Sequence, residues 1–310
     1  MISPTELTAA GRAIRAGQLV AFPTETVYGL GANALDAAAV ARIYEAKGRP
    51  PSSPLIVHVA AIEEARELAA EWPDTAQKLA ERFWPGPLTL VVRKKPVVPD
   101  IVTAGLDTVG LRVPAHPIAL AFIREAGVPV AAPSANRFTE LSPTTAEHVR
   151  KSLGSSVAMI LDGGLTDIGI ESTVVAISAG GASLLRPGVI TRQQIEAVIG
   201  PVALASQNTD EAHRSPGQHT RHYQPRTRLV LIDRGGALPG GSGALLYLSS
   251  PGKGGMSIQM PHDARGYAKR LYALLHDLDA QNLDWIAVET PPLDPEWEGV
   301  RDRLTRASAT

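Results

Sequence analysis

Apolar positions follow a helical period in several segments of the first 200 residues. An alanine-rich run after Ser3 ends at Gly17, and a second run lies between Asp36 and Gly48. A serine or aspartate before such a run and a glycine after it are typical helix caps, so both runs are predicted to be helices. The same reasoning predicts helices at 61–70, 74–83, 116–126, 144–152 and 191–199.

Short apolar runs bounded by proline, glycine or polar residues separate these helices and predict strands. They are residues 18–22, 55–59, 88–93, 109–113, 128–132, 158–161, 173–177 and 183–185. Because strands and helices are intermixed, the pattern indicates an α/β layer fold.

The pattern changes near residue 200, where periodicity is lost and then resumes in a shorter α/β unit. We therefore expect a catalytic domain over 1–200, a linker over 201–228 and a small C-terminal α/β domain over 229–310. The linker is polar and contains an aromatic residue, which is typical of a mobile lid over an active site. Its histidines also raise the question of a zinc site, but the absence of thiolates and of an HExxH motif disfavours one.

Composition narrows the class of protein further. With 310 residues, 44% of them hydrophobic, the chain is long enough for about two packed domains. The net charge of −1 provides no global basic field, so anion recognition must come from a local cluster. The absence of cysteine excludes disulfides, thiolate metal sites and a cysteine nucleophile. No basic leader and no apolar run of ~18 residues is found, so we expect a cytoplasmic protein without membrane contact.

Polar residues that could bind a ligand or take part in a reaction follow the first predicted strand and the second predicted helix. Thr24 and Glu25 lie just after a strand, where open α/β sheets place their ligands. Lys47 and Arg49 are two positions apart, so in an extended loop both cations would point at one anion. Alternatively, they are basic residues that complement the dipole at the end of a helix.

Further candidates lie at other strand ends. Thr108 and Arg112 flank one strand and could line a pocket, or Arg112 could be a charge on an exposed face. Small polar residues follow the next strand, and Ser142 precedes a helix start, where it could act only as a cap. Arg186 leaves a later strand and suits phosphate binding. Ser172 lacks a GxSxG context, which disfavours a serine hydrolase.

Taken together and in this order, these stretches resemble the YrdC-type threonylcarbamoyl-AMP synthase family in its long form, which carries a C-terminal domain. The resemblance covers residues 5–200 nearly continuously. Its motifs in this chain are FPTETVYGLGANA, KGRPPSSPLIVHV, WPGPLTLVV, TAGLDTVGLRVPAHP, PVAAPSAN, SPTTAEHV, GIESTVV and LLRPG. The segment SPGQHTRHYQP is similar to the long-form linker, but Thr220 stands where that pattern has its first tyrosine.

The resemblance implies a fold and a reaction. The fold would be a twisted open mixed sheet with helices around a concave cavity, followed by a smaller Rossmann-like α/β domain. The reaction would join L-threonine, bicarbonate or CO2, and ATP into L-threonylcarbamoyl-AMP, releasing pyrophosphate. This would be the first step of the N6-threonylcarbamoyladenosine modification at position 37 of tRNA. Such phosphoryl transfer needs positioning and charge neutralisation rather than a nucleophilic side chain.

The resemblance also implies roles for individual residues, with Lys47 and Arg49 at the reacting phosphates. It places L-threonine against Thr24, His58, Arg112, Ala132 and Ser172. It places ATP against Lys47, Arg49, Pro51, Thr108, Ser134, Asn136, Ser142, Arg186 and Tyr223.

Cofactor and partner expectations follow from the same resemblance. Mg2+ would arrive with the ATP phosphates rather than in a cage of protein ligands. The product would pass to tRNA threonylcarbamoyltransferase proteins, and a weak contact with tRNA itself is a further expectation. Two alternatives stay open at this point, an RNA-binding module and a carbamoyltransferase that handles carbamoyl-adenylate. Near-neutral charge and few aromatics weigh against the first, and the lack of cysteines for a zinc finger weighs against the second.

Overall fold

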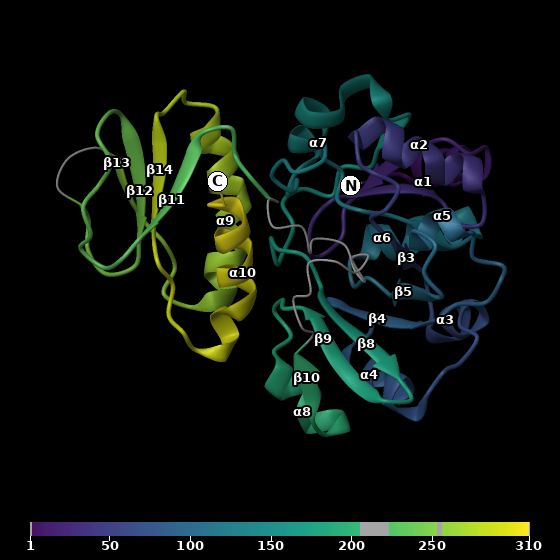
Figure 1. Cartoon of the computed structure of the whole chain (residues 1–310). Coiled ribbons are helices and arrows are strands. Elements are labelled where there is room, and N and C mark those ends of the chain that lie inside the picture. Colours follow the sequence, from purple (N-terminus) through teal and green to yellow (C-terminus); the bar gives the residue numbers. More distant parts are fainter. Residues whose placement is uncertain (1, 205–222, 253–255, 310) are drawn as a thin grey trace.

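The computed structural model describes residues 2–204, 223–252 and 256–309. Within these ranges, ten strands form a first sheet and four strands form a second (Figure 1). The α/β class expected from the sequence is therefore confirmed. Among the described residues, no helix combines the length and apolar character needed to cross a membrane.

The first sheet mixes parallel and antiparallel pairs in the order β10-β9-β8-β4-β5-β3-β6-β2-β1-β7. Its strands are β1 (Val20–Phe22), β2 (Gly29–Asn33), β3 (Ile56–His58), β4 (Leu88–Arg93), β5 (Thr108–Arg112), β6 (Val130–Ala131), β7 (Met159–Ile160), β8 (Thr173–Ser178), β9 (Gly181–Arg186) and β10 (Val202–Leu204). β3, β5 and β9 run in one direction and β8 runs parallel to β4, against them. The carboxyl ends of β3, β5 and β9 and the start of β8 therefore meet at one edge of the sheet.

Helices pack around this sheet (Figure 1). They are α1 (Pro4–Arg15), α2 (Ala37–Lys47), α3 (Ile62–Leu68), α4 (Asp74–Phe83), α5 (Asp100–Thr103), α6 (Pro117–Ala126), α7 (Ala146–Leu153) and α8 (Arg192–Ile199), with a 3-10 turn at Gly154–Ser156. The predicted caps are confirmed: Ser3 forms a capping box with Glu6, Asp36 accepts the first free amides of α2, and Gly48 is left-handed at φ 61°.

β2 was not predicted, because its sequence GLGAN contains two glycines and therefore a weak strand signal. The structure explains one of these glycines by close packing. A Cβ on Gly31 would lie 2.9 Å from the Val130 side chain and 3.1 Å from Phe22. Glycine therefore lets β2 fit tightly between β1 and β6.

The second sheet is wholly parallel, in the order β11-β14-β12-β13. Its strands are β11 (Arg228–Ile232), β12 (Gly243–Tyr247), β13 (Met256–Gln259) and β14 (Trp285–Glu289), and its helices are α9 (Ala264–Asp279) and α10 (Glu298–Ala307), with a 3-10 turn at Pro295–Trp297. The sequence predicts strands at 227–232, 244–248 and 285–289 and helices near 262–281 and 295–307 in this domain, and the structure confirms them. The sequence does not predict β13, because it is short and follows a glycine-rich stretch.

The predicted linker falls largely on residues 205–222, including Thr220, which lie outside the described residues. At its start, Val202–Leu204 is β10 and pairs with β9, so the first sheet extends past the expected boundary at 200. At its end, Tyr223 is buried. The lid expectation for this segment stays a prediction.

The two domains pack through α9 and α10, which lie between the second sheet and the first domain (Figure 1). Val27, Leu141 and Ile170 of the first domain belong to the same apolar cluster as the core of the second. The approach is close, because a Cβ on Gly299 of α10 would lie 2.9 Å from the Gly188 Cα. The second domain is therefore built onto the first domain over an apolar surface.

Candidate active site

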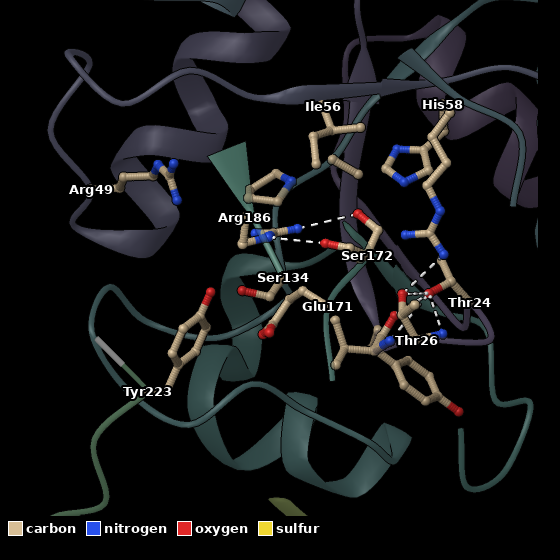
Figure 2. A pocket seen from close by; sticks show the side chains of 16 residues that line it. Thr24, Thr26, Arg49, Ile56, His58, Ser134, Glu171, Ser172, Arg186 and Tyr223 are labelled. Carbon is tan, nitrogen blue, oxygen red and sulfur yellow. Dashed lines mark hydrogen bonds between the residues drawn. The ribbon is translucent and has the colours of Figure 1, made fainter. Parts of the chain in front are cut away.

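A cavity opens beside the sheet edge where β3, β5 and β9 end and β8 begins (Figure 2). Thr24 comes from the loop after β1, and Ala132, Pro133 and Ser134 come from the loop after β6. Tyr223 completes the wall from the segment that leads into the second domain. Polar and charged side chains from distant parts of the sequence are thereby gathered around one space.

Arg112, at the end of β5, is the cation on one side of the cavity. It is buried, and its guanidinium donates to Glu25 Oε1 at 2.6 Å, to Thr26 Oγ1 at 3.0 Å and to the Gly86 carbonyl at 3.2 Å. The second carboxylate oxygen of Glu25 accepts from the Ala115 amide at 3.0 Å. Among the described residues, groups of the first domain therefore orient Arg112 toward the cavity.

Thr24 and His58 lie on the same side. The Thr24 hydroxyl donates to the Val27 carbonyl at 2.6 Å and lies 2.8 Å from the Thr26 hydroxyl. His58 pairs in register with Arg112 on the neighbouring strand. Burial, and then the Arg112 charge, lower the pKa of His58 to about 3, so its ring is neutral at physiological pH.

Arg186, at the end of β9, is held by Ser172. Its Nε donates to the Ser172 carbonyl at 3.1 Å and one of its terminal nitrogens donates to the Ser172 hydroxyl at 3.2 Å (Figure 2). The Ser172 hydroxyl also lies 2.8 Å from the Thr89 hydroxyl, which fixes it from β4. Ser172 therefore positions the Arg186 guanidinium at the cavity.

Arg49 approaches from the loop after α2 and is also buried. One nitrogen donates to the Ser53 hydroxyl at 2.5 Å and to the Pro54 carbonyl at 3.1 Å. Burial chiefly, and the Arg186 charge to a smaller extent, lower the pKa of Arg49 to about 10. Arg49 and Arg186 therefore repel each other, and an anion bound between them would stabilise both charges.

Lys47 lies behind the cavity wall rather than in it. Its ammonium donates to the Ser134 carbonyl at 2.6 Å and to the Asn136 carbonyl, so it ties α2 to the loop after β6. The Lys47–Arg49 pair thus has two separate positions, one supporting the loop and one lining the cavity. Burial lowers the pKa of Lys47 well below its ordinary value.

Glu171 brings a carboxylate to the cavity just before Ser172. Its Oε1 accepts from the Ser142 hydroxyl at 2.5 Å and its Oε2 accepts from Arg303 of α10 at 2.6 Å. Burial alone would raise the pKa of Glu171, but the charges of Arg303 and Arg186 and the Ser142 hydrogen bond lower it overall. Glu171 is therefore an anion compensated largely from the second domain.

Tyr223 stands beside this group with its backbone at φ 62°, a left-handed conformation that costs about 1–2 kcal/mol for a non-glycine residue. Its ring packs 5.3 Å from the Arg303 guanidinium and 5.9 Å from the Tyr272 ring. The tyrosine therefore belongs both to the cavity wall and to the packing between the domains.

The structure gathers most of the predicted site residues at this cavity. The predicted residues that line it are Thr24, Arg49, His58, Arg112, Ala132, Ser134, Ser172, Arg186 and Tyr223. Three others support that lining: Lys47 through the loop after β6, Asn136 on the same loop, and Ser142 through Glu171.

Pro51 and Thr108 are not among the described lining residues. Pro51 is exposed after α2, and Thr108 begins β5 at the end opposite to Arg112, where it pairs with Arg93. Two long connections rich in Gly, Pro and Thr, at 93–108 and 162–172, are expected from the sequence to be functional. The first adds no residue to the described lining, whereas the second contributes Glu171 and Ser172.

The sequence did not identify Glu171 and Arg303 as parts of this site. Thr26, which follows Thr24 and Glu25 at the end of the first predicted strand, is part of the ligand-binding segment expected there, and Glu171 lies within a recognised motif, so their positions were signalled but not their contacts. Arg303 carries no local signal, because it lies on a strongly charged helix and meets Glu171 from 132 positions away.

Three buried polar atoms at or near the cavity have no hydrogen-bond partner among the described residues: Arg49 Nε, His58 Nδ1 and Asn136 Oδ1. Buried polar atoms are normally paired, so such atoms point to a bound polar ligand. Within the described ranges, no three histidine or acidic side chains come together as a metal site would require. The cavity therefore offers hydroxyls and cations to an anionic ligand.

Comparison with known proteins gives the class. The family model described as "Telomere recombination", for Sua5, YciO and YrdC proteins, matches residues 12–188. The model described as "Threonylcarbamoyl-AMP synthase, C-terminal domain" matches residues 190–309. The fold and the cavity are thus those of a two-domain α/β protein of the Sua5–YciO–YrdC class.

Individual relatives narrow this further. A Bacillus subtilis protein named threonylcarbamoyl-AMP synthase is 42% identical over 98% of this chain and 93% of its own length. A Pyrococcus abyssi protein of that name is 51% identical over 71% of this chain and 66% of its own, just under two thirds. The crystal structure of P. abyssi Sua5 complexed with L-threonine matches with a TM-score of 0.92 at 39% identity, covering 99% of this chain and 95% of that one. The chain belongs to the threonylcarbamoyl-AMP synthase family, in its long two-domain form.

Proposed function

We propose that this protein makes L-threonylcarbamoyl-AMP from L-threonine, bicarbonate or CO2, and ATP, with release of pyrophosphate. The observation that carries the proposal is the convergence of three buried arginines, Arg49, Arg112 and Arg186, on one cavity lined by hydroxyls. One cation lies on the side of Thr24, and two lie on the side of Ser134 and Ser172. This distribution suits one carboxylate and one polyphosphate.

On the first side, Arg112 would bind the threonine carboxylate with its planar guanidinium. Glu25 and Thr26 keep that guanidinium oriented before the substrate arrives. His58, being neutral, adds no charge, and its buried Nδ1 can form a hydrogen bond with threonine. This arrangement would select a small hydroxylated amino acid and leave its amine facing the nucleotide side.

The chemical steps require positioning more than covalent catalysis. The neutral amine of threonine attacks CO2, forming an N–C bond and a carbamate and releasing one proton. A carbamate oxygen then attacks the α-phosphorus of ATP, and the bond to the bridging oxygen breaks in line so that pyrophosphate leaves. Arg49 and Arg186 would neutralise the charge on the phosphates, and Lys47 would hold the Ser134–Asn136 loop against the nucleotide.

Mg2+ would reach this site bound to the phosphates of ATP, where it supplies further charge neutralisation. Ser134, Asn136 and Ser142 would hold the metal-bound phosphates, as the resemblance implies. We further propose that the product passes to tRNA threonylcarbamoyltransferase proteins in the cytoplasm, with weak contact to tRNA. The RNA-binding and carbamoyltransferase alternatives become outcomes of the test.

The test incubates the full chain with ATP, labelled bicarbonate and single amino acids and separates the nucleotides formed. We expect a labelled acyl-adenylate and pyrophosphate with L-threonine, and much less with serine or valine. Carbamoyl-adenylate formed from labelled carbamoyl phosphate and ATP, without any need for threonine, would favour the carbamoyltransferase. RNA binding without any threonine-dependent product would overturn the proposal.

A further inference from the structure

Glu171 poses a physical problem at the proposed ATP site. It lines the cavity, is only 7% exposed and carries a negative charge where polyphosphate is to bind. Arg186, proposed as a phosphate ligand, lies near enough for its charge to act on Glu171. An uncompensated Glu171 carboxylate would repel the phosphates and compete with them for Arg186.

The second domain supplies the compensation. Arg303 on α10 donates to Glu171 Oε2 at 2.6 Å and to the Glu171 carbonyl at 3.2 Å, and its side chain is fully buried. A further nitrogen donates to the Pro187 carbonyl at 3.0 Å, next to Arg186. Tyr272 of α9 lies 3.4 Å from the same Glu171 oxygen. Ser172 and Arg186 hydrogen-bond to each other at the cavity. The second domain thus holds the residue before Ser172 and the residue after Arg186.

The hydrogen bonds of Glu171 and Ser172 connect Arg303 to Arg186 at the cavity. Glu171 Oε1 accepts from the Ser142 hydroxyl and Oε2 from Arg303, so both carboxylate oxygens are engaged by protein donors. Ser172, the next residue, holds Arg186 through its carbonyl and its hydroxyl. Arg303 is not among the described lining residues, so any effect on ATP must pass through the lining residues that it contacts, Glu171 and Tyr223.

We propose that Arg303 is a positioning residue for the ATP side of the site: it holds and neutralises Glu171, so that Arg186 faces the phosphates. The second domain thereby completes the cavity of the first. This inference rests on the proposed function for the identity of the nucleotide. It predicts that the Arg303 side chain affects ATP binding by neutralising the charge of Glu171 and not merely by packing α10 against the first domain.

The experiment compares Arg303→Met, Glu171→Gln and the double variant in the full chain. For each, ATP affinity is measured by calorimetry without threonine, and KM for ATP, KM for threonine and kcat are measured in the pyrophosphate assay. Arg303→Met should weaken ATP binding by about 10-fold or more while KM for threonine changes by less than about 3-fold. Adding Glu171→Gln should restore ATP affinity to within about 3-fold of the parent chain, a non-additive result.

Lys269→Ala is the matched control, because Lys269 forms an exposed ion pair with Asp167 at 3.2 Å across the same interface. It should leave ATP affinity unchanged. If Arg303→Met does not fold, Arg303→Lys retains the charge and should show a smaller loss that Glu171→Gln again relieves.

Equal weakening of ATP binding in the single and double variants would overturn the proposal, because packing rather than charge would then be responsible. Unchanged ATP affinity in Arg303→Met would overturn it as well. ATP binding by the parent chain without a threonine-dependent product would instead count against the proposed function alone.

Discussion

Two buried glutamate–arginine pairs border the cavity, and they face it in opposite senses. In the pair formed by Glu25 and Arg112, 2.6 Å apart, the arginine lines the cavity and the glutamate stands behind it. In the pair formed by Glu171 and Arg303, also 2.6 Å apart, the glutamate lines the cavity and the arginine stands behind it. The first pair belongs to one domain and presents a cation, whereas the second bridges two domains and shields an anion.

The difference shows that an ion pair at a site cannot be interpreted from its distance alone. A buried pair brings little net stability, because desolvation of the two ions offsets their attraction. Its value for function depends on which partner faces the ligand. The two pairs should therefore respond differently when one charge is removed and the other is neutralised.

The largest effect is expected at the first pair. Arg112→Ala removes the proposed carboxylate ligand and leaves Glu25 buried without its partner, which should cost about 3–5 kcal/mol of unfolding free energy and reduce threonine-dependent turnover by at least about 100-fold. Urea denaturation and the pyrophosphate assay measure the two losses.

Adding Glu25→Gln to Arg112→Ala separates the loss of stability from the loss of turnover. Stability should return in part, because the buried charge is gone, while turnover stays low, because the ligand for threonine is still missing. At the Glu171–Arg303 pair, neutralising the glutamate should instead restore ATP binding. Recovery of turnover in the Arg112→Ala/Glu25→Gln variant would contradict the contrast between the pairs.

The second prediction concerns Lys47, which supports the nucleotide side from the first domain. Lys47→Met keeps the aliphatic stem but leaves the Ser134 and Asn136 carbonyls without their donor, at a cost of about 1–3 kcal/mol for each buried group. Loosening of this loop should lower kcat/KM for ATP by roughly 10- to 100-fold in steady-state assays. Glu45→Ala, on an exposed position of the same helix, is the control and should change nothing. Parent-like kinetics for Lys47→Met would remove Lys47 from the site.

Sequence patterns predicted most of the fold because its elements are marked locally. Caps such as Ser3 and Asp36 and apolar runs such as Leu88–Arg93 identify helices and strands without knowledge of the rest of the chain. β2 escaped because its glycines serve packing against Phe22 and Val130, which only the assembled sheet reveals.

The candidate site likewise contains residues that the sequence could predict and residues that it could not. Arg49, Arg112 and Arg186 lie in motifs or at strand ends, so their association with a cavity could be predicted. The distinct roles of Lys47 and Arg49 could not, because two residues only two positions apart point to different partners. Arg303 was beyond reach, since a charged helix in a separate domain is usually solvated, and only the tertiary contact shows this side chain to be buried.

A smaller effect is expected at Tyr223, where the two domains meet at the cavity wall. Tyr223→Ala would remove a buried ring, so its effect on ligand binding could not be separated from the loss of packing. Tyr223→Phe keeps the ring beside Arg303 and should raise KM for ATP about 5-fold, the value of one hydrogen bond. Tyr267→Phe is the matched control, because the Tyr267 hydroxyl is buried in the second domain without a hydrogen-bond partner among the described residues. Equal KM values for both variants would exclude a ligand contact by the Tyr223 hydroxyl.

The smallest effect concerns the interface that brings Arg303 to Glu171. His148 of α7 and His276 of α9 stack at 3.8 Å, and the His276 ring donates to the Ser142 carbonyl at 3.1 Å. Burial chiefly, and then the His276 and Lys151 charges, lower the pKa of His148 to about 3, and burial lowers the pKa of His276. The hydrogen bond to the Ser142 carbonyl, and then the charges of Asp279, Asp277 and Glu140, raise the pKa of His276 without reversing the overall shift.

Both histidines therefore bind protons less readily in the folded protein than in the unfolded chain. For His148 the window runs from the unfolded pKa of about 6.5 down to the folded pKa of about 3, and for His276 it begins at the same unfolded pKa. In this window the unfolded chain holds more protons, so stability falls as the pH falls. The slope should reach at most about 1.4 kcal/mol per pH unit for each histidine. Urea denaturation at about pH 7 and pH 5.5 measures it, and His148→Asn/His276→Gln, which keeps a donor for Ser142, should reduce the slope. An unchanged slope in that variant would place the acid sensitivity elsewhere than in the contact between the domains.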